Sequence, residues 1–508
     1  MDIFDYDRYL LLQKNIRYRL FPEGRIIRRG RKNTPYFFLQ TVRSRLLRKT
    51  DTLISDTASR MLVKALCLGY KNDLEPEIKN TFVKTGTIHL LAVSGLHTGA
   101  VYLLLGFLLR LTGINNRYLH LALLPVLWMY AGITGLSPSV IRAAQILSFI
   151  TIGRVFVRDY SPVNCIAASA FFTLLFQPHA LYSISMQMSY AAYTGIILLY
   201  PLCHKTVSRF PKLIRPVGSL LCISLSAQLA TFPLSIYYFH FFSLSGFLIN
   251  IPAVPLATLL LYTSLILLIL PYAIGLYLTF IVVWLCQGLL LILLNLSGLS
   301  LYLDTLYPSF LTVIFLYLTF FTLYGSIKRK KYFPALGISL CLLSGSLCWN
   351  NYRLSHIREI TVFHFRNRSC ILLHYNGFYG FPGPAPDSFS RAKIAPYILR
   401  HKLKPLPEGC GILSKNFTCI PGNTSRFSPS LHIPGPEYAS GLSASIWIIT
   451  DNRQPPALTD SIPNFPTSVI LDASNAPYSI RAWEKFCGER SISLKKTSEL
   501  GHIRISLE

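Results

Sequence analysis

Residues 89–99, HLLAVSGLHTG, gather side chains capable of chemistry in an otherwise apolar part of the chain. Ser94 and His97 are three positions apart, so a helix places them on the same side. Gly95 and Gly99 share a helix face, at the spacing that lets a second helix approach to backbone contact. A hydroxyl and an imidazole inside a membrane are costly unless they face a partner or a wet cavity. Taken alone, these residues leave both tight helix packing and a polar functional site open.

A few polar residues in other apolar segments extend this candidate site. Arg142 is the only charged residue near the start of its segment, where it can meet a phosphate or snorkel to lipid headgroups. Gln187, Gln228 and Asn250 either bond across helices or face a polar path. Prolines kink helices and open cavities, and three stand in the same part of the chain: Pro233, Pro252 and Pro255.

The elements that position these residues are predicted to be membrane-spanning helices. The chain has 508 residues and is 52% hydrophobic and 14% charged, whereas a typical soluble protein has roughly 25% charged residues. Between Arg215 and Lys328 the only charged residue is Asp304. A bilayer crossing needs about 20 mostly apolar residues. The segments that fit are 88–109, 118–136, 139–157, 162–178, 181–202, 217–237, 243–270, 272–297, 306–327 and 333–350.

Positive charge alternates between the loops that join these segments. The loops after the first, third, fifth and ninth segments carry Lys or Arg, and the loops after even-numbered segments carry none. The positive-inside rule therefore predicts that the first segment starts outside the cytoplasm and that the chain beyond residue 354 lies outside too. Residues 1–50 conflict with this topology, because their net charge of +9 would also lie outside. Residues 53–69 carry charges in their middle, so we expect an amphipathic helix in the membrane interface rather than another crossing.

From residue 355 onward the sequence predicts a small α/β domain. Short β-branched or aromatic runs such as EITVFHF and TSVILDA alternate with Pro- and Gly-rich loops, while RAKIAPYILRHKL and YSIRAWEKFCGERS fit helices. The pairing of the cysteines in this part stays open: Cys370, Cys410, Cys419 and Cys487. The chain is thus divided into a basic N-terminal segment (1–50), an amphipathic lead-in (51–87), a transmembrane domain (88–350) and a soluble domain (355–508).

Four sequence blocks, in order, resemble the ComEC competence family. The first is ALCLGYKNDLEPEIKNTFVKTGTIHLLAVSGLHTG at residues 65–99. It is followed by YAGITGLSPSVIRAAQ at 130–145, MQMSYAAYTGI at 186–196 and SAQLATFPLSIYYFHFFSLSGFLINIPAVP at 226–255. The resemblance covers roughly residues 40–508. It implies a channel through which one strand of external DNA enters the cytoplasm during natural transformation, with the Ser94–His97 segment at a broken or tightly packed helix beside the path.

Residues 359–508 resemble, weakly, the C-terminal part of ComEC proteins, which in many members is a metallo-β-lactamase-like fold. Members thought to degrade the unwanted strand carry an HxHxDH metal-binding cluster. Here no two histidines of the domain are closer than eight residues, and only scattered acids such as Asp451 and Asp472 remain. The sequence therefore predicts no metal site, no cofactor and no nuclease activity. The predicted fold class is a polytopic α-helical membrane protein of about ten transmembrane segments, with a small C-terminal α/β domain resembling a degenerate metallo-β-lactamase-like fold.

The sequence is compatible with three functions. The resemblance implies a passive channel for single-stranded DNA in the bacterial inner (plasma) membrane, in contact with lipids, a cytoplasmic helicase or DNA-binding protein and an external DNA receptor. The sequence has no Walker motif, so the chain is not expected to power transport itself. Broken helices with buried Gln and Asn also suit a transporter of a small solute or lipid-linked sugar. AVSG resembles the rhomboid Ser-Gly motif of intramembrane serine hydrolases, but Ser94 and His97 on one helix rarely align for proton transfer.

Overall fold

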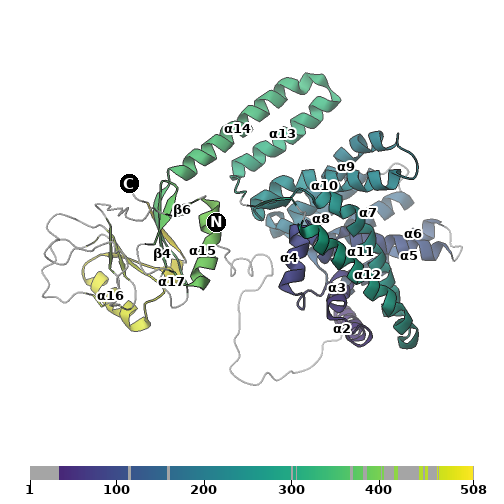
Figure 1. The fold of residues 1–508 in the computed structure, drawn as a ribbon, viewed down its shortest axis with the longest axis horizontal. Helices are drawn as coiled ribbons and strands as arrows, with labels where there is room; N and C mark the ends of the chain where they lie inside the picture. The colour runs from purple at the N-terminus through teal and green to yellow at the C-terminus, as the bar shows by residue number, and fades with distance from the viewer. Residues whose placement is uncertain are drawn as a thin grey trace. The chain divides into compact units, whose positions relative to one another are not determined.

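The structure is a computed structural model whose chain divides into two compact units, each described by itself (Figure 1). Among the described residues, one unit spans 34–307 and the other spans 308–506. The description covers residues 34–506 apart from 112–115, 157–160, 299–300, 305, 366–369, 382–385, 402, 406–416, 421–445, 450–451, 453, 456–465, 467 and 501.

The first unit is built from helices. Its α-helices are α2 (Pro35–Leu53), α3 (Thr57–Leu68), α4 (Pro76–Lys84), α5 (Gly95–Arg110), α6 (Asn116–Ile133), α7 (Pro138–Phe156), α8 (Pro162–Phe176), α9 (Ile184–Val207), α10 (Arg215–Tyr238), α11 (Gly246–Ile269) and α12 (Tyr272–Gly298). Short 3-10 helices precede α5 and α9, at η1 (Ile88–Leu91) and η2 (Pro178–Tyr182). Strands β1 (Phe241–Ser243) and β2 (Tyr302–Asp304) pair as an antiparallel ribbon.

The helices confirm a membrane protein and support six crossings by length and composition. Among the described residues, six helices are long and apolar enough to span a bilayer: α7, α10, α11, α12, α13 (Phe310–Lys328) and the run Lys330–Ser355 that contains α14 (Phe333–Ser355). Helices α5 and α8 and residues Leu121–Ile133 of α6 are apolar but shorter. Each of the ten segments expected to cross contains one of these helices or α9. The first is shorter than expected, because the backbone is extended at Ala92 and Ser94 and α5 begins only at Gly95.

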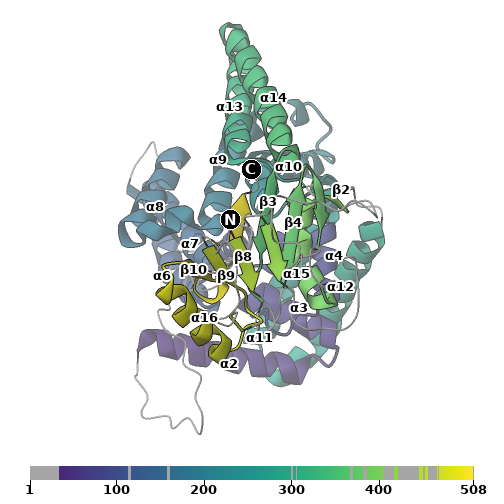
Figure 2. The ribbon, with the colours of Figure 1, turned by 90° about the vertical axis from the view of Figure 1, so that its left-hand side faces the viewer.

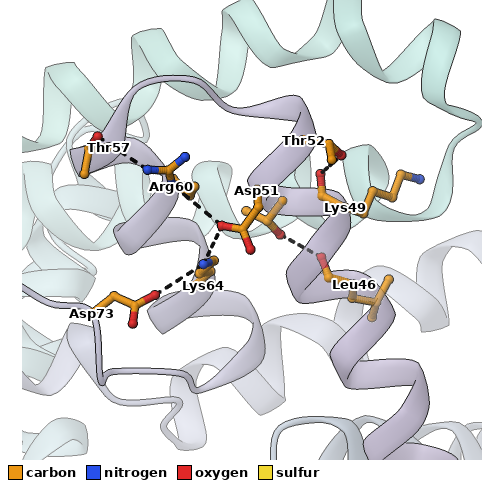
Figure 3. A network of polar contacts seen from close by, with 9 residues as sticks. Leu46, Lys49, Asp51, Thr52, Thr57, Arg60, Lys64 and Asp73 are labelled. Carbon is orange, nitrogen blue, oxygen red and sulfur yellow. Dashed lines mark hydrogen bonds and ion pairs between the residues drawn. The ribbon is translucent and has the colours of Figure 1, made fainter.

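The helix expected in the membrane interface is buried instead. The α3 side chains Leu62, Val63 and Leu66 are 0% exposed and pack in one core with leucines of α11 and α12. The charge of Lys64 does not keep α3 at a surface, because its Nζ lies 2.6 Å from Asp51 and 3.3 Å from Asp73 (Figure 3). A buried charge is tolerated when it is paired in this way. The helix in residues 53–69 therefore belongs to the core of the unit, and its Lys64 charge is paired with two aspartates.

Polar side chains of α2 bond to the C-terminal ends of other helices. Arg43 Nη2 donates to the Leu68 carbonyl of α3 at 2.9 Å, and Lys49 Nζ donates to the Leu268 carbonyl of α11 at 2.9 Å. Gln40 Nε2 donates to the Gly132 carbonyl of α6 at 3.2 Å. The last carbonyls of a helix have no partner within it, and cations near them are favourable. Part of the positive charge of residues 1–50 thus serves contacts inside this unit.

The second unit begins with a helical hairpin and continues into a domain of two sheets. Helices α13 and α14 are joined through η3 (Lys330–Tyr332), and Thr322 Oγ1 lies 2.9 Å from Ser339 Oγ between them. One sheet has the order β11-β3-β4-β5-β6, and the other has the order β10-β9-β8-β7 with all strands parallel. The remaining elements of this domain are β3 (Arg358–Val362), β4 (Ile371–Tyr375), β5 (Phe378–Gly380), α15 (Ser388–Arg400), β6 (Lys404–Pro405), β7 (Phe417–Ile420), β8 (Ile446–Ile449), β9 (Ser468–Leu471), α16 (Pro477–Glu489), β10 (Ser493–Lys496), α17 (Thr497–Leu500) and β11 (Ile503–Ser506).

The two sheets face each other and each carries a helix on its outer side. Ile360 and Leu373 of one sheet pack against Ile448 and Ile470 of the other. Helix α15 covers the outer face of β4, and α16 covers the outer face of β8 and β9 through Trp483 (Figure 2). The period-two alternation of apolar residues allows each strand to serve two cores in this way. The predicted α/β domain is therefore observed as a helix–sheet–sheet–helix sandwich.

The described part of this domain shows no metal centre. No group of three or more His, Cys, Asp or Glu side chains among the described residues is placed to hold a metal ion. Asp472 Oδ1 accepts from the Ser474 N–H and from Asn475 Nδ2, each at 3.0 Å, which is a turn at the end of β9. Asp451 and Cys410 lie outside the described residues, as does the side chain of Cys419. Cys370 and Cys487 are buried free thiols.

Candidate polar site where α5, α7 and α9 begin

Ser94 and His97 close the N-terminal end of α5. Ser94 has an extended backbone and is the N-cap residue, and its N–H donates to His97 Nδ1 at 3.3 Å. Because Nδ1 accepts this bond, the Ser94 hydroxyl, 3.0 Å away, donates to the same nitrogen. A neutral imidazole then carries its proton on Nε2. The pair is a capping box in which His97 takes the place usually held by Glu or Gln.

Gly95 lies in close contact with residues of neighbouring helices, whereas nothing outside its own helix lies close to Gly99. A Cβ atom on Gly95 would collide with the Tyr193 hydroxyl of α9 and would lie 3.7 Å from Ala143 Cβ of α7. A Cβ atom on Gly99 would meet nothing within 4 Å outside its own helix. The close contact foreseen for this glycine pair thus occurs at Gly95 alone.

Arg142 lies at the same place and is held by oxygens of α9. Its side chain projects from α7, the residue is 3% exposed, and Nη2 donates to the Ser185 carbonyl and hydroxyl, both at 2.7 Å. Nη2 also lies 2.8 Å from Ser189 Oγ. These partners are uncharged, so the guanidinium is fixed in position without being neutralised.

These contacts connect the starts of α5 and α7 with α9. Ser139 Oγ of α7 donates to the Val93 carbonyl just before α5, at 3.0 Å. Ala143 and Tyr193 flank Gly95, and Arg142 joins α7 to the first turn of α9. Of the residues expected at the site, the structure brings together Ser94, Gly95, His97 and Arg142.

The sequence interpretation missed the α9 residues of the site. Ser185, Ser189 and Tyr193 are spaced four apart, so they form one row along α9. That row was present in the block at residues 186–196 and its flank, and its helical spacing was the available signal. A further hydrogen bond joins α7 to α8, where Thr173 Oγ1 donates to Gln145 Oε1 at 2.9 Å.

The remaining residues expected at the site point elsewhere. Gln187 Oε1 accepts from the Tyr238 hydroxyl of α10 at 2.7 Å, so it links α9 to α10. Asn250 Nδ2 donates to Ser224 Oγ at 2.8 Å between α11 and α10. Gln228 lies against Gly246, where a Cβ atom would be 3.1 Å from Nε2. Helices α10 and α11 run on through their internal prolines, Pro233, Pro252 and Pro255.

Comparison with known proteins identifies the family. A family model described as Competence protein matches residues 66–330, which contain the whole polar site. The chain is 31% identical over 218 residues to ComE operon protein 3 of Bacillus subtilis, covering 43% of this chain and 27% of that protein. It is 27% identical over 237 residues to Recombination protein 2 of Haemophilus influenzae, covering 44% of this chain and 30% of that protein. No solved structure matches the chain.

The apolar helices and the polar cluster among them define a polytopic membrane protein. Its family follows from the match over residues 66–330: the chain belongs to the competence protein family, the ComEC family. The matched stretches cover less than a third of the length of these two relatives.

Proposed function

We propose that this chain conducts single-stranded DNA across the bacterial inner membrane during natural transformation. The observation that carries the proposal is the family match over residues 66–330, the region that holds Ser94, Gly95, His97 and Arg142. Polar and charged groups inside membrane helices are costly and mark transport paths. Gln187, Gln228 and Asn250 are proposed to extend the path between α9, α10 and α11.

Further parts of the proposal follow from the family and the charge pattern. Ten crossings, with α9 and the shorter helices included, place the C-terminal domain outside the cytoplasm. The four layers of that domain are the basis for proposing a metallo-β-lactamase-like fold without a metal site. A cytoplasmic helicase or DNA-binding protein supplies the driving force, and a receptor outside supplies the DNA. The proposed domain organisation is a basic N-terminal segment (1–50), a lead-in (51–87), a transmembrane domain (88–350) and a soluble domain (355–508).

Uptake of labelled DNA by a deletion strain tests the proposal. Cells that carry the intact chain are expected to internalise the label, and cells without the gene or with residues 86–99 deleted are not. A Gly95→Leu variant supplies a milder change, because its side chain would fill the space of the Tyr193 hydroxyl. Gly99→Leu is the matched control, since a Cβ atom at Gly99 would meet nothing within 4 Å. Normal internalisation in the deletion strain would reject DNA uptake and favour a solute transporter.

A serine hydrolase is the other alternative, and Ser94→Ala decides it. In the described part of the chain, no carboxylate accepts a hydrogen bond from His97 Nε2 to orient the imidazole as a catalytic triad requires. A channel is expected to keep most of its DNA flux when the Ser94 hydroxyl is removed, because the hydroxyl only contributes one hydrogen bond to the cap of α5. Complete loss of activity with normal amounts of protein in the membrane would instead indicate a nucleophile.

A further inference from the structure

The starts of α5 and α7 lie side by side, and the Arg142 side chain of α7 reaches the first turn of α9. Gly95 opens α5 beside Ala143 of α7 and Tyr193 of α9, and Ser185 lies in the first turn of α9. The first N–H groups of a helix lack partners within the helix, and its N-terminal end carries about half a positive charge. Half-helices that point such ends at one position are a known way to bind anionic groups in membranes. By itself this arrangement does not define a site.

Arg142 provides the second, independent observation. The residue is 3% exposed, and its Nε is buried with no hydrogen-bond partner in the described part of the chain. Only Nη2 is engaged, by the oxygens of Ser185 and Ser189. Among the described residues no carboxylate forms an ion pair with this guanidinium. The site therefore holds a buried cation without a carboxylate partner, near the start of α7 and against the first turn of α9.

Such a charge arrangement favours an anion. Removing an unpaired ion from water costs several kcal/mol, and the serine oxygens offset only part of that cost. An anion near Arg142 would supply the missing countercharge and accept the free N–H donors. Ser185, on the α9 side of the guanidinium, is exposed.

We infer that Arg142 and the N-terminal ends of α7 and α9 bind a phosphate group, and that Ser185 and Ser189 hydrogen-bond the guanidinium until the phosphate replaces them. The inference deepens the proposed function, because the phosphate is that of the transported strand. The serine contacts then act as a closed state of the path between α7 and α9. Removing the two hydroxyls should leave the Ser185 carbonyl as the remaining partner of Nη2 and so strengthen phosphate binding.

Binding to the full chain in nanodiscs of zwitterionic lipid tests this inference. The probes are a fluorescent single-stranded oligonucleotide and, separately, inorganic phosphate as its competitor. Arg142→Gln is expected to weaken oligonucleotide binding at least tenfold, and Ser185→Ala with Ser189→Ala is expected to tighten it two- to fivefold. Inorganic phosphate should displace the oligonucleotide from the native chain and much less from Arg142→Gln. Arg110→Gln and Ser148→Ala are the controls, one at the exposed end of α5 and one on α7 with its hydroxyl turned to Ala144.

The outcomes separate this inference from the proposed function. Unchanged affinity in Arg142→Gln, with weaker binding in the double serine variant, would show that Arg142 only ties α7 to α9 and would overturn the inference. If that result accompanied normal dependence of DNA uptake on the gene, the channel proposal would stand alone. Binding of phosphate but not of the oligonucleotide, lost in Arg142→Gln, would keep the anion site and remove DNA as its ligand.

Discussion

At the scale of single residues, the C-terminal domain contains two imidazoles in a dry core. His374 of β4 is 0% exposed and His401, at the end of α15, is 7% exposed, and their rings lie against each other and against Tyr397. His374 Nδ1 lies 3.3 Å from the Tyr397 hydroxyl, which donates to Glu359 at 2.5 Å. Neither ring nitrogen of His401 has a hydrogen-bond partner among the described residues. Burial lowers the pKa of His374 to about 4, and burial together with neighbouring His374 lowers the pKa of His401 to about 4.

This arrangement predicts that the domain loses stability in acid. The folded state favours the neutral imidazoles, so their contribution is complete above the ordinary pKa of 6.5 and is lost as the pH falls towards 4. The loss amounts to on the order of 3 kcal/mol for each imidazole. We expect the urea midpoint of the full chain in detergent, followed by tryptophan fluorescence, to fall between pH 7 and pH 4.

A single substitution separates this effect from general acid sensitivity. His401→Phe removes two unpaired ring nitrogens and keeps the ring beside Tyr397, whose centroid is 4.3 Å away. The variant is expected to be at least as stable at pH 7 and to lose roughly half of the acid dependence. Substitution of the exposed His356 by Phe should leave the dependence as it is. Equal pH profiles for His401→Phe and the native chain would contradict the prediction.

At the scale of elements, helix contacts in the first unit depend on individual glycines. On α9, a Cβ atom at Gly195 would collide with the Cβ of Ala230 and lie 2.8 Å from the Ser226 carbonyl of α10. Neither neighbour is a flexible side chain, so the helices would have to move apart. By contrast, Gly99 of α5 has open space around it.

We therefore predict opposite effects for the same substitution at these two positions. Gly195→Ala should destabilise the protein by about 1–3 kcal/mol, because it overpacks the contact between α9 and α10. Gly99→Ala should be neutral or stabilise by up to about 1 kcal/mol, because alanine favours a helix. The measurement is the thermal unfolding midpoint of each purified variant in the same detergent. A lower midpoint for Gly99→Ala than for Gly195→Ala would show that the helices pack differently.

At the scale of the whole molecule, the long helices and the loop charges predict which side of the membrane each loop occupies. The loop between α9 and α10 carries Arg209 and Lys212, and the β1–β2 ribbon that joins the opposite helix ends carries no Lys or Arg. The positive-inside rule assigns the first loop to the cytoplasm and the ribbon to the outside. The ten crossings proposed above predict that the C-terminal domain is outside the cytoplasm.

A protease-cleavable tag after residue 508 is expected to be cut from outside in spheroplasts. The same tag inserted beside Lys212 should be cut only after the cells are broken. A cytoplasmic C-terminal tag, together with a cytoplasmic Lys212 tag, would mean that one of the five helices from α10 to α14 does not cross the membrane. The count of ten would then be wrong even though the family assignment stands.

The sequence by itself determined the membrane class, the family blocks and the position of each apolar helix, because hydrophobicity and helical period are local properties. It also located Ser94, Gly95, His97 and Arg142, since polar residues are conspicuous in an apolar background. Only the tertiary structure decided that these four residues meet while Gln187 and Asn250 turn to other helices. It also decided that α3 is a core helix, because the partners of Lys64 lie on other segments of the chain. Which residues a polar side chain contacts depends on how the helices pack, and the spacing of residues along the chain does not show that packing.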